Sequence, residues 1–164
     1  MSIIKLENYA EGHWVSSQNS SEVLFNAITG EPIYSTGSDG LDFEAMMNYA
    51  RRIGNRNLRR MTFQERGRML KALALHLLTK KELFYKVSAY TGATKADSWV
   101  DIEGGFGTFF TYSGLAKRML PNTPFWVDGD TQKISANGTF LGTHILTPSE
   151  GISIQINAYN FPVW

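Results

Sequence analysis

The sequence contains no cysteine, which excludes disulfide bonds, thiolate metal sites and a cysteine nucleophile within these 164 residues. An excess of one charge is also missing, because 16 lysine and arginine residues stand against 15 acidic residues, for a formal net charge of +1. Such a balance gives no overall field that favours nucleic acid or an anionic membrane. No partner of either kind is therefore expected.

Long apolar runs are absent as well, and no segment reaches transmembrane length. The first residues, MSIIKLENYAEGHW, have neither the apolar core nor the cleavage site of a signal peptide. The three histidines, His13, His76 and His144, lack metal-ligand spacing, so no metal site is expected. These features predict a cytoplasmic protein, and the length predicts one domain.

Residues 13–36 have the pattern of short strands separated by turns. HWV is one candidate, and the apolar runs 23–25 and 33–34 flank the turn composition Thr29-Gly30-Glu31-Pro32.

Helices are expected next. Ser38 or Asp39 is the candidate cap of the first, which has an apolar stripe at helical spacing and is expected to end at Gly54. A capping box, Thr62-x-x-Glu65, opens the second. Apolar residues lie on opposite sides of this second helix, so we expect it to be packed between two layers.

A second box, Thr79-x-x-Glu82, predicts the start of the third helix, which ends at Gly92. The fourth is expected from about 95 to 119, stopped before Pro121.

Three glycines, Gly104, Gly105 and Gly107, lie inside the fourth helix. Each costs about 1 kcal/mol relative to alanine, which suggests that another helix or a ligand approaches this backbone closely. The surrounding EGGFGTFF does not fit a phosphate-binding loop, because its glycine spacing differs and it lies within a helix.

After Pro121 the period changes to that of strands. The segments FWVDGD and QKISANGTFLGTHILT are predicted to form strands, with turns at Asp128-Gly129 and Asn137-Gly138. The segment PSEG then leads into a last strand, ISIQIN, whose composition suits a position with neighbours on both sides.

Two charged clusters have ordinary structural interpretations. Asp97 and Asp101 are one helical turn apart and would suit a carboxylate pair, but the aromatic residues beside them favour the solvated edge of a packed helix. A basic cluster lacks interleaved aromatics and is expected to cap a helix end and meet acidic partners; its members are Arg51, Arg52, Arg56, Arg59 and Arg60.

Asn160 is the strongest candidate for chemistry. It follows the last expected strand and precedes Phe161 and Pro162, at the kind of strand end where open α/β sheets bind ligands. Its carboxamide would suit the stabilisation of an oxyanion. The alternative, that Asn160 caps a turn, remains open on composition alone.

An ordered set of motifs resembles the aldehyde dehydrogenases over roughly residues 13–164. FNAITGEPIYS resembles their NP-x-TGE strand turn, the helices from RRMTFQERG to KRMLP resemble the series that follows, and INAYNFPVW resembles the PWNFP element that begins the cofactor domain. Within that superfamily, TGATKADSWVDIEGG and INAYNFP are most similar to the bacterial ring-opening enzymes of phenylacetate degradation, the oxepin-CoA hydrolase and semialdehyde dehydrogenase type.

The resemblance implies an enzyme that oxidises a CoA-linked semialdehyde with NADP or NAD. In this reading Asn160 holds the oxyanion, and the preceding strand end lines the nicotinamide side of the cofactor cleft with Ile156, Asn157, Ala158 and Tyr159. Phe161 and Gly104 match the substrate tunnel. Ala158 and Tyr159 replace the usual Pro-Trp pair, which favours the ring-opening branch.

The resemblance also implies a fold: an α/β chain with an N-terminal strand and helix part over 1–120, a β-hairpin oligomerisation arm over 121–150, and over 151–164 the first strand of an incomplete Rossmann-like sheet. The hairpin, at about 124–147, would pair with another subunit in a homo-oligomer. The catalytic cysteine and base glutamate of the family lie beyond the NFP element, so these residues alone are expected to be inactive. The alternative is a non-catalytic oligomerisation or interaction module.

Overall fold

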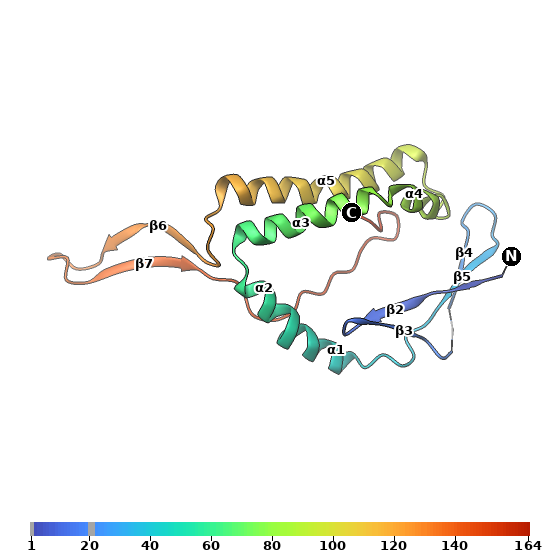
Figure 1. The fold of residues 1–164 in the computed structure, drawn as a ribbon, viewed down its shortest axis with the longest axis horizontal. Helices are drawn as coiled ribbons and strands as arrows, with labels where there is room; N and C mark the ends of the chain where they lie inside the picture. Colours follow the sequence, from blue (N-terminus) through green and yellow to red (C-terminus); the bar gives the residue numbers. More distant parts are fainter. Residues whose placement is uncertain (1, 20–21) are drawn as a thin grey trace.

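A pair of long antiparallel helices forms the centre of the computed structural model, which describes residues 2–19 and 22–164. Helices α3 (Phe63–Leu78) and α5 (Lys95–Met119) lie side by side, and α4 (Lys81–Ala89) covers one end of α5. In Figure 1 the N-terminal strands lie at one end of the molecule, and a two-stranded arm projects from the opposite end.

The close packing of α3 on α5 depends on small residues at the crossing. A β-carbon added to Gly67 would lie 2.8 Å from the β-carbon of Ala116, so the two backbones approach closely there. Phe106 and Ile102 of α5 are buried, and the Phe84 ring of α4 meets Phe106 edge-to-face with centroids 5.4 Å apart. These contacts form the hydrophobic core among the described residues.

Only one face of α3 is covered. Leu75 is 51% exposed and Leu73 is 42% exposed, whereas Ala74 is fully buried. The expectation that α3 is packed between two layers is therefore wrong for this structure, because no described element covers its outer side.

The N-terminal strands form two small sheets. Strand β5 (Pro32–Thr36) pairs antiparallel with β4 (Glu22–Phe25) and parallel with β1 (Ile4–Lys5). Strands β2 (Glu7–Ala10) and β3 (His13–Ser16) form a separate antiparallel pair. The strands expected within residues 13–36 are thus confirmed. The backbone N–H of Ala27 donates to Tyr90 O over 2.8 Å, which joins the β4–β5 loop to the end of α4.

The first helix differs from the expectation at both ends. Helix α1 (Phe43–Tyr49) is capped by Asp42, whose carboxylate accepts from Ala45 N over 2.9 Å, rather than by Ser38 or Asp39. It does not stop at Gly54, because the chain stays helical through the π-helix η1 (Ala50–Asn55) and α2 (Arg56–Arg60). The extended backbone of Met61 ends it.

The capping box at Thr62 and Glu65 is confirmed at the start of α3. The second box is wrong, because the Thr79 hydroxyl donates to His76 O over 2.7 Å at the end of α3, and α4 begins after Lys80. The bounds of α5 match the expected helix, with Thr94 as its cap.

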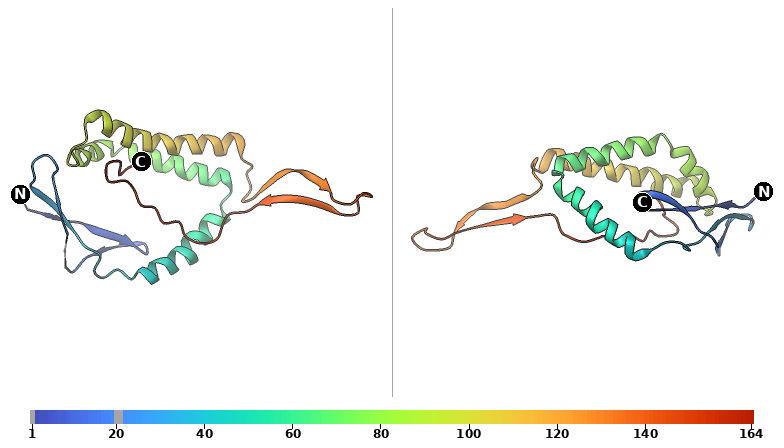
Figure 2. Two further views of the ribbon diagram at one scale, coloured as in Figure 1. Left: turned by 180° about the vertical axis from the view of Figure 1, so that it is seen from behind. Right: turned by 60° about the horizontal axis from the view of Figure 1, so that its bottom comes forward.

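The projecting arm is an antiparallel hairpin of β6 (Trp126–Lys133) and β7 (Leu141–Leu146), with Trp126 opposite Leu146 and Lys133 opposite Leu141. Both views in Figure 2 show it clear of the helices. Asn137 and Gly138 lie in its terminal loop, as expected. The turn expected at Asp128-Gly129 is wrong: β6 continues through it with a register shift, and Gly129 has a φ of +74°. A glycine readily adopts this conformation in a β-bulge.

The structure assigns no strand to residues 152–157. Residues 147–164, called the strap below, run along the molecule outside any named helix or strand. Figure 1 traces the strap, in brown and red, from the hairpin past α2 to the side of α3 and α5. A strand is defined by hydrogen bonds to neighbouring strands, and the described residues supply none beside this segment. The mixture of helices and small sheets agrees with the α/β class, while the Rossmann-like strand over 151–164 is not formed here.

No helix among the described residues combines the length and apolar character that crossing a bilayer requires.

Candidate functional site

Asn160 lies at the tip of a tight turn near the end of the strap. The Phe161 N–H donates to Ala158 O over 3.2 Å and closes the turn. The Asn157 side chain donates from Nδ2 to Pro162 O over 2.9 Å and ties the two arms of the turn together. Among the described residues, no group forms a hydrogen bond with the Asn160 carboxamide, which therefore remains available to a ligand.

A buried carboxylate anchors this turn to α5. Asp101 is only 2% exposed, and its Oδ1 accepts from Val163 N over 3.1 Å and from Trp164 N over 2.7 Å. The expectation that Asp101 lies on a solvated helix edge is wrong. One signal in the sequence did indicate burial: the small residues Ser98 and Gly105 lie one helical turn before and after Asp101, on the same face of α5.

Asp97 and Asp101 do not form the carboxylate pair considered from their spacing, because each has partners of its own. Asp97 is exposed at the start of α5, where its carboxylate accepts from the Thr94 hydroxyl over 2.7 Å.

The glycines of α5 make room for the end of the strap. A β-carbon on Gly104 would lie 2.9 Å from Cε3 of the Trp164 ring and closer still to Cζ3, and one on Gly105 would lie 3.2 Å from Trp164 Cα. The close approach predicted from these glycines is confirmed, and the approaching group is the chain's own segment. Gly107 has open space beside it. The substrate contact predicted at Gly104 stays a prediction, since Trp164 occupies the space over it here.

A surface hollow of about 580 Å³ lies between the Asn160 turn and the loop from α4 to α5. The loop contributes Thr91, Gly92 and Ala93, and the turn contributes Asn160 and Phe161. Asp97 and Tyr159 complete the lining. The structure therefore brings Asn160 and Phe161 together at one opening.

The four residues predicted to face a cofactor lie on the exposed part of the strap. Ile156 is 88% exposed and Tyr159 is 97% exposed, and Asn157 and Ala158 are exposed as well. These residues can supply one wall of a cofactor cleft, but the described residues around them contain no glycine-rich loop that would hold a diphosphate.

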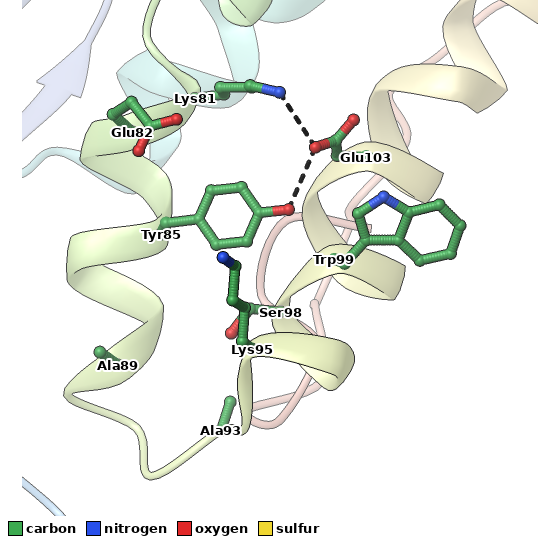
Figure 3. Close-up of a pocket in the computed structure, with 9 residues that line it drawn as sticks. All are labelled: Lys81, Glu82, Tyr85, Ala89, Ala93, Lys95, Ser98, Trp99 and Glu103. Carbon is green, nitrogen blue, oxygen red and sulfur yellow. Dashed lines mark hydrogen bonds and ion pairs between the residues drawn. The ribbon is translucent and has the colours of Figure 1, made fainter.

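A second hollow, of about 470 Å³, lies between α4 and α5 on another side of α5 (Figure 3). Glu103 of α5 accepts hydrogen bonds from Lys81 Nζ and Tyr85 Oη of α4, each over 3.1 Å. The bonds from Lys81 and then Tyr85 lower the pKa of Glu103, and the bond to Glu103 raises the pKa of Lys81. Desolvation raises the pKa of Tyr85. A carboxylate satisfied in this way braces the two helices and is not poised to take up a proton.

The basic cluster meets an acidic partner at one of its members. Arg59 forms an ion pair with Glu150 and donates from Nε to Pro148 O over 3.2 Å. Asn55 Nδ2 donates to Ser149 O over 3.3 Å, so α2 holds the beginning of the strap. Among residues 2–19 and 22–164, no group of histidine or acidic side chains is arranged to hold a metal ion.

Comparison with known proteins identifies the class to which this fold and turn belong. A sequence model of the aldehyde dehydrogenase family matches residues 14–164. The chain therefore belongs to the aldehyde dehydrogenase family, a family of oxidoreductases, and the resemblance drawn from its motifs is confirmed.

One curated relative is the 3,4-dehydroadipyl-CoA semialdehyde dehydrogenase of Aromatoleum evansii. It is 31% identical to this chain over 162 residues, and the matched part covers 98% of this chain. The same part amounts to 31% of the relative's own length.

Proposed function

We propose that these residues form part of an aldehyde dehydrogenase that oxidises a CoA-linked semialdehyde to the acid, with Asn160 as the oxyanion donor. The observation that carries the proposal is the Asn160 turn: its backbone is held at both ends, while its carboxamide is free and lines a hollow. A fixed donor of this kind costs no reorganisation when charge develops on a carbonyl oxygen.

The Asn160 amide would donate to the aldehyde oxygen and polarise the carbonyl before attack. The same N–H would hold the negative oxygen that forms when a nucleophile adds to the carbonyl carbon. Since the sequence has no cysteine, the thiolate expected from the family would come from residues outside this sequence. We accordingly expect residues 1–164 alone to have no aldehyde-oxidising activity.

NAD or NADP would accept the hydride from the substrate in such an enzyme. The exposed strap over Ile156 and Tyr159 would form one wall of its site, and other parts of the complete gene product would have to bind its phosphates.

The name of the Aromatoleum evansii relative supports a CoA-linked semialdehyde as the substrate. Phe161, beside Asn160 in the hollow, is proposed to contact this substrate. Assignment to the ring-opening branch of phenylacetate degradation is part of the same proposal, supported by Ala158 and Tyr159 in place of the Pro-Trp pair.

The test uses the complete gene product and measures NAD(P)H formation from a CoA-linked semialdehyde. Replacing Asn160 with alanine or aspartate removes the donor, and we expect kcat to fall about 100-fold or more. Asn57→Ala is the matched control, because Asn57 is exposed on α2 and remote from the hollow in sequence and fold. If the Asn160 variants retain wild-type kcat, the oxyanion assignment is wrong.

The β6–β7 hairpin favours a second, non-catalytic role in assembly. Its apolar side chains are open to solvent, with Leu141, Ile145 and Leu146 each more than half exposed. Both strands also carry an unpaired edge among the described residues. We propose that the hairpin joins copies of the chain into a homo-oligomer, either within the enzyme or, in the alternative, as the main role of an interaction module.

Light scattering on purified protein tests this assembly role. Ile145→Lys should dissociate the oligomer, whereas His144→Lys, on the opposite face of β7, should leave it intact. A wild-type monomer at working concentration would reject the proposal. Loss of the oligomer with full aldehyde oxidation would separate assembly from catalysis.

A further inference from the structure

The buried carboxylate of Asp101 has a hydrogen-bonding arrangement that packing alone does not require. It is 2% exposed, and among the described residues it has no basic partner. It accepts hydrogen bonds from two consecutive backbone N–H groups of the strap, those of Val163 and Trp164. A buried carboxylate costs free energy unless its oxygens accept hydrogen bonds, so the strap must lie in this place for the Asp101 oxygens to be satisfied.

The restraint extends from these two bonds back to Asn160. Pro162 lies between them and Asn160, and its ring fixes one backbone torsion. The Asn157 side chain holds the Pro162 carbonyl, and the Phe161 N–H is bonded to Ala158 O. Few free torsions remain between the anchored N–H groups and Asn160.

A steric restraint acts at the same place. The Trp164 ring lies over Gly104, and the Trp164 and Val163 backbone lies over Gly105. The strap therefore meets α5 through a carboxylate on one turn of the helix and bare backbone on the next. Sliding the strap along α5 would break the hydrogen bonds and drive the ring against side chains.

We propose that Asp101 is a positioning residue for the reaction: by holding Val163 N and Trp164 N, it fixes the turn that aims the Asn160 carboxamide at the substrate oxygen. This inference rests on the proposed function of Asn160. Asp101 itself touches neither substrate nor cofactor in this arrangement, and it acts through the backbone of the strap.

The first experiment measures amide hydrogen exchange in the complete gene product. Asp101→Asn keeps a single acceptor oxygen and places an NH2 group where the other oxygen was, beside the donor N–H of Val163. We expect exchange at Val163 and Trp164 to accelerate about 10-fold or more, since bonds to charged acceptors are the stronger ones. Glu103→Gln is the matched control, because Glu103 is an acid of the same helix with two hydrogen bonds to α4 and none to the strap. Unchanged exchange in Asp101→Asn would overturn the inference.

A second pair of variants tests the anchor without altering α5. Trp164→Pro removes the ring and the donor N–H, whereas Trp164→Ala removes the ring alone. We expect a lower kcat in Trp164→Pro than in Trp164→Ala. Equal kcat in the two would mean that the N–H bonded to Asp101 has no role, and would also overturn the inference.

The third experiment asks whether Asp101 acts through Asn160. In the wild-type background, Asp101→Asn should lower kcat about 10- to 100-fold with little change in KM, as expected for a displaced donor. In the Asn160→Ala background it should have almost no further effect. A residue with a merely structural role would cause the same loss in both backgrounds, and that result would refute the inference.

These outcomes separate the two proposals. Activity lost in Asn160→Ala and retained in Asp101→Asn would overturn the positioning role alone. Wild-type activity in Asn160→Ala would overturn the proposed function together with this inference.

Discussion

Replacement of Gly104 with alanine tests the seat of Trp164 on α5 most directly. Inside a helix, a change from glycine to alanine gains about 1 kcal/mol of stability when nothing obstructs the new methyl group. Gly107 provides this reference, because an added β-carbon there meets no atom within 4 Å. Gly107→Ala should therefore stabilise the protein by about 1 kcal/mol.

At Gly104 the same methyl group would meet the Trp164 ring at 2.9 Å or less and displace it. Trp164 is 61% exposed, so roughly two fifths of its surface, about 100 Å², is covered, and losing that contact costs about 2 kcal/mol. The loss of the contact then exceeds the gain in helix propensity. Gly104→Ala should lower the free energy of unfolding by about 1 kcal/mol.

Equilibrium urea unfolding followed by circular dichroism measures these differences. In a Trp164→Ala background the obstruction is gone, so Gly104→Ala should stabilise by about 1 kcal/mol, as Gly107→Ala does. Equal stabilisation by the two alanines in the wild-type background would refute the proposed contact between Gly104 and Trp164.

Three further predictions concern the helices. Thr62→Ala removes the capping box of α3 and should cost about 1 kcal/mol by urea unfolding, whereas a cost near zero would mean that the cap contributes nothing. Gly67→Val would drive a side chain into Ala116, and the melting temperature should fall; an unchanged value would contradict the close crossing of α3 and α5. Glu103→Gln should lower the melting temperature near neutral pH, and the difference from wild type should shrink as pH falls through the lowered pKa of Glu103. The difference should shrink again as pH rises through the raised pKa of Lys81, and a difference independent of pH would exclude the ion pair as its cause.

Elements with strong local signals were predictable from the sequence. The bounds of α5 followed from apolar periodicity and from Pro121, and the start of α3 followed from Thr62 and Glu65. Asn137 and Gly138 marked the end of the hairpin. In each case the deciding interactions lie within a few residues of one another, so their pattern is visible in the chain.

Predictions failed where a local signal had competitors. Gly54 suits a helix end, yet the backbone continues through η1 to Arg60. Thr79 and Glu82 match a capping box, but the Thr79 hydroxyl bonds to the preceding turn instead. Asp128 and Gly129 suit a turn, yet pairing with β7 turns them into a bulge. The free energy of tertiary contacts and of hydrogen bonds to the neighbouring backbone outweighs such weak local preferences.

The motifs of the chain were sufficient to identify the family, the start of α3, both ends of α5 and the position of Asn160 before Phe161 and Pro162. What surrounds Asn160 became visible only in the folded arrangement. Asp101, assigned to a solvated edge by its spacing, is the buried anchor of a segment 62 and 63 residues further along the chain. The glycines of α5 predicted that some group approaches this helix closely, but they did not predict that the group is the Trp164 ring. The physical reason is the same for both: a hydrogen bond or a contact between residues far apart in sequence depends on how the elements pack, and no local pattern records it.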